Sequence, residues 1–127
     1  MGRVVIDASA LVAFLFAEPS GEAVATRLPG TLASTLSLSE VIAYAFTRGK
    51  PLDAVLTGLQ RLPVEAVPFD LPLAALAATF KPLTRHLGLS LADRACLAVG
   101  LDRGLPVLTG DRAWAGTDLG VRVELFR

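Results

Sequence analysis

The sequence predicts an α/β fold, a three-layer α/β/α sandwich with a mostly parallel central sheet. Short apolar segments rich in β-branched residues alternate with longer segments of helical periodicity, which is typical of a parallel sheet covered by helices on both faces. Hydrophobic residues make up 53% of the chain, enough to bury such a sheet. A length of 127 residues suits one domain with its own core, so we expect a single domain over residues 1–127.

The first predicted strand, residues 4–6, is wholly apolar and ends at Asp7. A helix follows from about Ser9 to Ala17, where the sequence EPSG breaks it. A strand, a carboxylate and a helix in this order present a charged group at the carboxyl edge of a sheet, where α/β folds place their sites. The alternative is that Asp7 or Ser9 serves only as the N-cap of the helix.

The next segments continue the alternation as far as a proline-containing strand. We expect a helix over residues 21–28, a strand over 31–35 and helices over 37–48 and 51–62. Gly49 is a typical helix stop and Pro51 a typical helix start. The strand predicted over residues 64–69 contains Pro68, which cannot donate a backbone hydrogen bond, so this strand belongs at an edge of the sheet.

The second half predicts three further helical segments and two strands. These are a helix from residue 70 or 71 that Pro82 interrupts, a helix over 90–102, a strand over 105–109, a helical turn around 113–114 and a strand over 121–126. Gly104 follows the helix over 90–102 as its stop.

Four acidic residues recur at comparable places, and we expect them to form the site: Asp7, Glu40, Asp93 and Asp111. Two follow strands and two lie in the first turns of helices, and in a parallel α/β sheet both places are at the same edge. Each also has a structural alternative. Ser37 with Glu40, and Ser90 with Asp93, could form capping boxes, and Asp111 follows a glycine in a turn.

Carboxylates that gather at one edge repel each other, and a divalent cation relieves this conflict. The chain has one cysteine, Cys96, and one histidine, His86, and neither stands at the positions of the four acids. The expected ligands are therefore carboxylate oxygens, which favour Mg²⁺ or Mn²⁺ over zinc. Such an ion acts on phosphate oxygens and acidifies water. Ser9 and Thr109 could orient a ligand or a water molecule, although local capping explains them equally well.

Composition excludes several other classes of function. Twelve basic and twelve acidic residues balance, which argues against a non-specific nucleic-acid coat. No apolar segment is long enough to span a membrane, and Arg3 leads directly into a strand, so we expect neither a membrane partner nor a signal peptide. A single cysteine suits the reducing cytoplasm, although it is also compatible with other compartments. The high hydrophobic content predicts an apolar face for self-association, hence a homodimer.

Four segments together resemble the PIN-domain nucleases, above all the VapC-type toxins of bacterial toxin–antitoxin pairs. They are residues 5–11 (VIDASAL), 39–41 (SEV), 90–95 (SLADRA) and 108–114 (LTGDRAW). The resemblance implies an α/β/α sandwich, Mg²⁺- or Mn²⁺-dependent cleavage of RNA, a homodimer and inhibition by a small VapB-like antitoxin. Carried over by position, it implies Asp7, Glu40 and Asp93 as the acidic core with Asp111 as the fourth acid, although Asp118 is a rival for that place.

If RNA is the substrate, a neutral chain needs a local basic rim. Candidates for phosphate contacts flank the acidic segments: Arg48, Lys50, Arg94 and Arg112. Ordinary surface charge explains each of them alone. Cys96 and Trp114 are expected in the core, and His86 on the surface.

Other classes of function fit less well. A receiver-like signalling module needs a lysine after a late strand, and a phosphatase with an aspartyl nucleophile needs a second acid two residues after Asp7; neither is present. A non-catalytic metal-, nucleotide- or partner-binding module remains an alternative.

Overall fold

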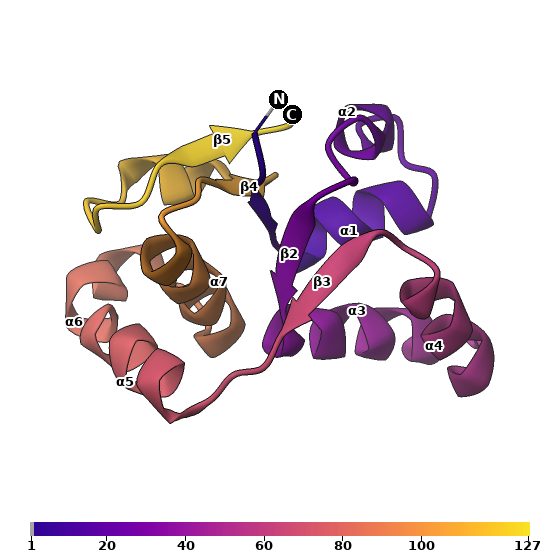
Figure 1. The fold of residues 1–127 in the computed structure, drawn as a ribbon, viewed down its shortest axis with the longest axis horizontal. Helices are drawn as coiled ribbons and strands as arrows, with labels where there is room; N and C mark the ends of the chain where they lie inside the picture. The colour runs from indigo at the N-terminus through magenta and orange to yellow at the C-terminus, as the bar shows by residue number, and fades with distance from the viewer. Residues whose placement is uncertain (1) are drawn as a thin grey trace.

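The computed structural model describes residues 2–127 and contains a five-stranded sheet in which every strand pairs in parallel (Figure 1). Met1, the first residue of the predicted domain, lies outside the described residues. The strands are β1 (Val5–Ile6), β2 (Thr31–Ser34), β3 (Val64–Val67), β4 (Val107–Thr109) and β5 (Val123–Leu125). Their order, β3-β2-β1-β4-β5, places β1 at the centre and the proline-flanked β3 at an edge, as predicted.

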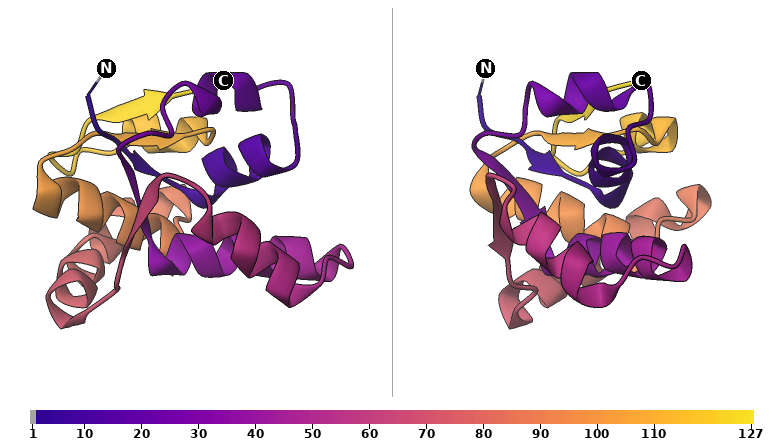
Figure 2. Two further views of the ribbon diagram at one scale, coloured as in Figure 1. Left: turned by 45° about the vertical axis from the view of Figure 1, so that its right-hand side comes forward. Right: turned by 90° about the vertical axis from the view of Figure 1, so that its right-hand side faces the viewer.

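Helices cover both faces of the sheet (Figures 1 and 2). The helices are α1 (Ala8–Leu15), α2 (Gly21–Ala25), α3 (Thr35–Thr47), α4 (Leu52–Gln60), α5 (Leu71–Thr79), α6 (Lys81–Thr84) and α7 (Leu91–Arg103), with 3-10 turns η1 (Arg85–Leu87) and η2 (Arg112–Gly116). Helices α1 to α4 lie on one side of the sheet and helices α5 to α7 on the other, which confirms the three-layer sandwich.

Alternation along β1 divides the core into two layers. Val5 joins a buried cluster with α5 and α7, whereas Val4 and Ile6 join a second cluster with α1 and α2. All three side chains are fully buried. In the described part of the chain, no helix is both long and apolar enough to cross a membrane.

One helix start differs from the prediction in a way that affects the site. Helix α3 begins at Thr35, because Ser34 at the end of β2 acts as the N-cap and accepts a hydrogen bond from the backbone N–H of Leu36 at 3.2 Å. The capping box considered for Ser37 and Glu40 is therefore absent, and Glu40 lies in the second turn of α3.

Candidate active site

Asp7 lies directly after β1 and is buried, with 5% of its surface exposed. Its Oδ1 accepts hydrogen bonds from Ser9 Oγ at 2.7 Å and from the backbone N–H of Ala10 at 3.0 Å, so Asp7 does cap α1. Its Oδ2 accepts a bond from Thr109 Oγ1, at the end of β4, at 2.6 Å. Burial raises the pKa of the Asp7 carboxyl above its usual value, although these three hydrogen bonds act to lower it.

The hydroxyls of Ser9 and Thr109 connect Asp7 to the loop after β4. Ser9 Oγ accepts from the backbone N–H of Gly110 at 2.9 Å, and Thr109 Oγ1 accepts from that of Asp111 at 3.0 Å. Each hydroxyl therefore donates to the carboxylate and accepts from the backbone, which fixes its orientation. The two polar residues singled out in the sequence both contact Asp7.

Glu40 and Asp93 share the electrostatic environment of Asp7. Partial burial of the Glu40 carboxyl, followed by the negative charges of Asp93 and Asp7, raises the pKa of Glu40. The charge of Asp93 also contributes to the raised pKa of Asp7. Elements β1, α3 and α7 thus bring three of the four predicted acids to one edge of the sheet.

Asp93 takes part in a capping box and keeps one oxygen outside it. Its Oδ2 accepts from the backbone N–H of Ser90 at 2.9 Å, while Ser90 Oγ accepts from the backbone N–H of Asp93 at 3.1 Å. The structural alternative is therefore correct for Asp93, but it occupies only Oδ2. Oδ1 is left for another partner.

Asp111 lies at the margin of this group. It is exposed, and its Oδ1 accepts from the backbone N–H of Ala113 at 3.0 Å, so it caps η2. Its own backbone N–H reaches Asp7 through Thr109, as described above. Asp118, the rival fourth acid, is also exposed, in the loop between η2 and β5.

The donor set suits a hard divalent cation that keeps part of its water shell. Within residues 2–127, no three Asp, Glu, His or Cys side chains form a preformed cluster that could enclose an ion. Mg²⁺ commonly binds through one or two carboxylates plus waters, so it does not need such a cage. Burial is the main cause that raises the pKa values of Glu40 and Asp7, and the negative charges of neighbouring acids add to it; a cation would neutralise those charges. An ion held by Asp7, Glu40 and Asp93 would therefore be bound in part through its own water molecules.

A cavity of about 370 Å³ opens beside these acids. Its lining includes Ser9 and Glu40 from the predicted site, together with Ala8, Val12, Glu18, Tyr44 and Arg127. Glu18, Tyr44 and Arg127 line this cavity but were not among the predicted site residues. A signal existed for Arg127, because it follows the last predicted strand and parallel strands end at the same edge.

The predicted basic rim is wrong at Arg94. This side chain is buried, and its Nη1 donates to the carbonyl of Ala77 in α5 at 3.1 Å. Arg48 bonds the carbonyl of Tyr44 at 3.2 Å and covers the Tyr44 ring, with its Cζ 3.4 Å from the ring centroid. Arg112 is exposed. Arg94 therefore joins α7 to α5 and does not face solvent.

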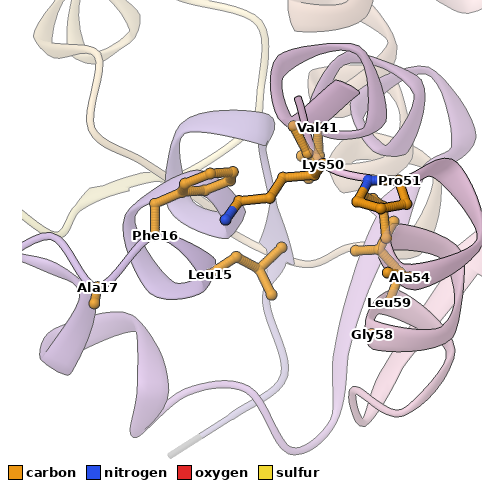
Figure 3. A pocket seen from close by; sticks show the side chains of 11 residues that line it. Leu15, Phe16, Ala17, Val41, Lys50, Pro51, Ala54, Gly58 and Leu59 are labelled. Carbon is orange, nitrogen blue, oxygen red and sulfur yellow. The ribbon is translucent and has the colours of Figure 1, made fainter. Parts of the chain in front are cut away.

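Lys50 lines a different, apolar cavity of about 470 Å³ between α1, α3 and α4 (Figure 3). Its ammonium group points into the space between Leu15 and Phe16 from α1 and its following turn. Among the described residues that line this cavity, Lys50 is the only charged one.

Three residues with alternative roles lie where the sequence analysis expected them. Cys96 and Trp114 are fully buried in the cluster beneath α5 and α7. Burial raises the pKa of the Cys96 thiol well above its usual value, so the thiol is neutral and unreactive. His86 is exposed in η1.

Solved structures of toxin–antitoxin proteins share this fold. A toxin–antitoxin complex from Klebsiella pneumoniae superposes with a TM-score of 0.77 at 16% identity, covering 98% of each chain. DNA-bound VapBC from Salmonella typhimurium gives 0.76 at 20% identity over 100% of each chain. VapC20 from Mycobacterium tuberculosis, described as a Sarcin-Ricin loop cleaving toxin, gives 0.73 at 19% identity, covering 94% of this chain and 98% of that chain.

Comparison with curated protein sequences gives no significant match. The model of the PIN domain family, in contrast, matches residues 4–119. That match includes all four predicted acids and every strand except β5. The chain therefore belongs to the PIN domain family.

Proposed function

We propose that this protein is a cytoplasmic, metal-dependent endoribonuclease of the VapC toxin type, inhibited by a VapB-like antitoxin. The observation that carries the proposal is the buried Asp7 carboxylate, which is bonded by Ser9 and Thr109 and shares its electrostatic environment with Glu40 and Asp93. A buried carboxylate with two further acids nearby is costly for the fold unless a cation neutralises the charge. Such a cost is typical of functional sites.

The acids and the two hydroxyl groups of the site have different roles in this proposal. Asp7, Glu40 and Asp93 would hold the ion, and Asp111 would assist from the loop after β4. When bound, Mg²⁺ or Mn²⁺ polarises a phosphodiester and acidifies water. Ser9 and Thr109 hold the Asp7 carboxylate in one orientation, so its oxygens need no rearrangement when the ion binds.

The solved relatives support the choice of partner. One is described as a toxin–antitoxin complex and another as a member of the VapBC family of toxin–antitoxin systems. One relative is described as cleaving the Sarcin-Ricin loop. We extend these properties to this chain as part of the proposal.

The test replaces Asp93 and compares it with an acid on the same helix. Asp93→Asn removes a charged ligand, while the amide oxygen can still accept the Ser90 N–H, so the fold should persist. We expect this variant to lose Mn²⁺ binding in calorimetric titration and to lose cleavage of RNA. Asp102→Asn, an exposed acid near the other end of α7, should bind Mn²⁺ and cleave RNA like the wild type. Full activity in folded Asp93→Asn would refute the assignment.

A second candidate function is a non-catalytic module that only binds a partner. The capping bonds of Asp7, Asp93 and Asp111 favour it, because each explains an acid without any metal. A wild-type protein that binds an antitoxin but neither binds Mn²⁺ nor cleaves RNA would establish this function.

A further inference from the structure

Arg127 lines the same cavity as Glu40, one of the acids of the candidate active site. Ser9 and Glu40 contribute to the lining of this cavity, and so does Arg127, which follows β5. Beyond β5 the chain runs toward the connection between α1 and α2 (Figure 2). Arg127 thus adds a guanidinium group that the predicted basic rim did not include.

Gly110 makes room for this guanidinium. A Cβ atom added at Gly110 would lie 2.5 Å from Arg127 Nε and 2.8 Å from Arg127 Cζ, closer than real Cβ contacts. Gly110 belongs to the site loop, because its backbone N–H donates to Ser9 Oγ at 2.9 Å. The guanidinium therefore packs directly on the backbone that joins Thr109 to Asp111.

Arg127 forms a half-exposed ion pair with Glu18, which another anion can replace. Its Nη1 is 3.3 Å from Glu18 Oε1, and the two side chains are 44% and 35% exposed. Its Cζ lies 5.1 Å from the ring centroid of Phe126. A half-exposed ion pair contributes little free energy, so another anion can take the place of Glu18 at small cost. Phosphate is well suited, because a guanidinium group bonds phosphate oxygens with two parallel hydrogen bonds.

We propose that Arg127 binds a backbone phosphate of the RNA strand at the active site and that Glu18 occupies Arg127 in its absence. The inference rests on the proposed ribonuclease function. Without a bound metal ion the acids would repel an RNA strand, and a guanidinium group in the cavity lined by Glu40 would offset this repulsion and hold a phosphate. Arg127 is an RNA-binding residue in this account, and its neighbour Gly110 positions it.

The experiment measures RNA binding without cleavage. Binding of a short fluorescein-labelled single-stranded RNA is followed by fluorescence anisotropy in EDTA, over a series of salt concentrations. Arg127→Ala should weaken binding about tenfold, as expected for one charge-assisted contact. The slope of log K against log salt should fall by about 0.7, the value for one phosphate contact on a single strand. Arg127→Lys should recover part of the loss.

Two further variants change the position or the partner of Arg127 and keep its charge. Gly110→Ala should displace the guanidinium and weaken RNA binding severalfold, because the three atoms nearest to the added methyl group all belong to the guanidinium of Arg127. Glu18→Gln should strengthen binding severalfold, because it removes the competing carboxylate. Thermal melting of each variant verifies that the fold persists.

Arg3→Ala is the matched control. Arg3 also pairs with a glutamate, Glu65, at 3.3 Å and is 51% exposed, but it precedes β1 and lies at the opposite edge of the sheet. Its removal should leave RNA binding nearly unchanged. Equal losses in Arg3→Ala and Arg127→Ala, or wild-type binding in Arg127→Ala, would overturn the inference and leave only a structural clasp between Arg127 and Glu18.

Cleavage by the wild type in Mn²⁺ separates the two hypotheses. If the wild type cleaves RNA while Arg127→Ala binds as tightly as the wild type, the inference fails and the nuclease stands. If the wild type does not cleave but loses RNA binding on Arg127→Ala, the nuclease fails and the Arg127 contact stands. A wild type that does not bind RNA overturns the inference.

Discussion

At the scale of single residues, two opposing effects act on the carboxyl group of Asp7. Burial penalises its charge, while Ser9, Ala10 and Thr109 donate hydrogen bonds that favour the charge. Burial is the larger effect, so the pKa of the carboxyl is raised. A fold optimised for stability alone would place a neutral group here, which is why we assign Asp7 a functional role.

Asp7→Asn should therefore stabilise the metal-free protein at neutral pH. The folded-state pKa of Asp7 lies above the unfolded-state value, so the folded state binds more protons between the two values and the free energy of unfolding falls as pH rises through this window. The asparagine lacks the charge and this pH dependence. In EDTA at pH 7, we expect the variant to melt at a higher temperature than the wild type. The two melting temperatures should approach each other as the pH falls toward 4.

The measurement is thermal unfolding of both proteins across that pH range, with and without Mn²⁺. Mn²⁺ should raise the melting temperature of the wild type only, because the ion neutralises the carboxylate that the variant lacks. A melting temperature of Asp7→Asn below that of the wild type at every pH would show that the hydrogen bonds to Asp7 outweigh the cost of burying its charge.

Arg94 should affect stability and not RNA binding. Its Nη1 bonds the Ala77 carbonyl from within the core, and its Nε has no hydrogen-bond partner in the described part of the chain. Arg94→Ala removes a charged hydrogen bond and should lower the free energy of unfolding by about 1.5–3 kcal/mol. Urea denaturation measures this loss. A reduced salt dependence of RNA binding in the folded variant would restore Arg94 to the basic rim.

At the scale of elements, the contact of α7 with β4 leaves no room for an added methyl group. A Cβ atom at Gly100 would lie 2.8 Å from Val107 Cγ1 and 3.1 Å from the backbone oxygen of Leu105. The close approach positions α7, and with it Asp93, against the sheet. The sequence shows only a glycine in a helix, which by itself is unfavourable.

Gly100→Ala should destabilise the protein by about 1–3 kcal/mol through overpacking. Gly58→Ala, in the middle of α4, is the matched control, because a Cβ atom there meets nothing within 4 Å. The control should stabilise the protein by about 0.5–1 kcal/mol, the helix-propensity difference between glycine and alanine. Urea denaturation of both variants tests the pair, and the same sign of change in both would refute the packing argument.

Helix starts show where local patterns mislead. Ser90 and Asp93 predicted a capping box that the structure contains, because no better cap precedes them. Ser37 and Glu40 matched the same pattern, but Ser34 at the end of β2 caps the helix one turn earlier. Where β2 ends depends on its pairing with β1 and β3, which a local pattern does not include.

At the scale of the whole molecule, the homodimer stays a prediction. Large hydrophobic side chains remain exposed on the single chain, with Leu71 at 82%, and Phe46 and Leu83 at 60% each. Such exposure is consistent with a further interface. Light scattering at micromolar concentration should give twice the chain mass of 13.3 kDa. A mass of 13.3 kDa would contradict the argument from hydrophobic content.

The sequence by itself determined the alternation of strands and helices, the edge position of β3 and the places of Asp7 and Asp93. Each depends on local chemistry: apolar periodicity, a proline without an N–H, and a carboxylate that follows a strand or caps a helix. These signals persist in any tertiary context that keeps the sheet parallel.

Only the tertiary structure decided which polar side chains meet. It buried Arg94 against α5, brought Thr109 to Asp7 across β1 and β4, and packed Arg127 on Gly110. These contacts join residues far apart in the chain, and their geometry depends on how closely elements pack and on how a neighbouring layer desolvates a charge. Neither quantity is a property of a local segment, so the burial of one arginine and the exposure of another could not be predicted from their neighbours in sequence.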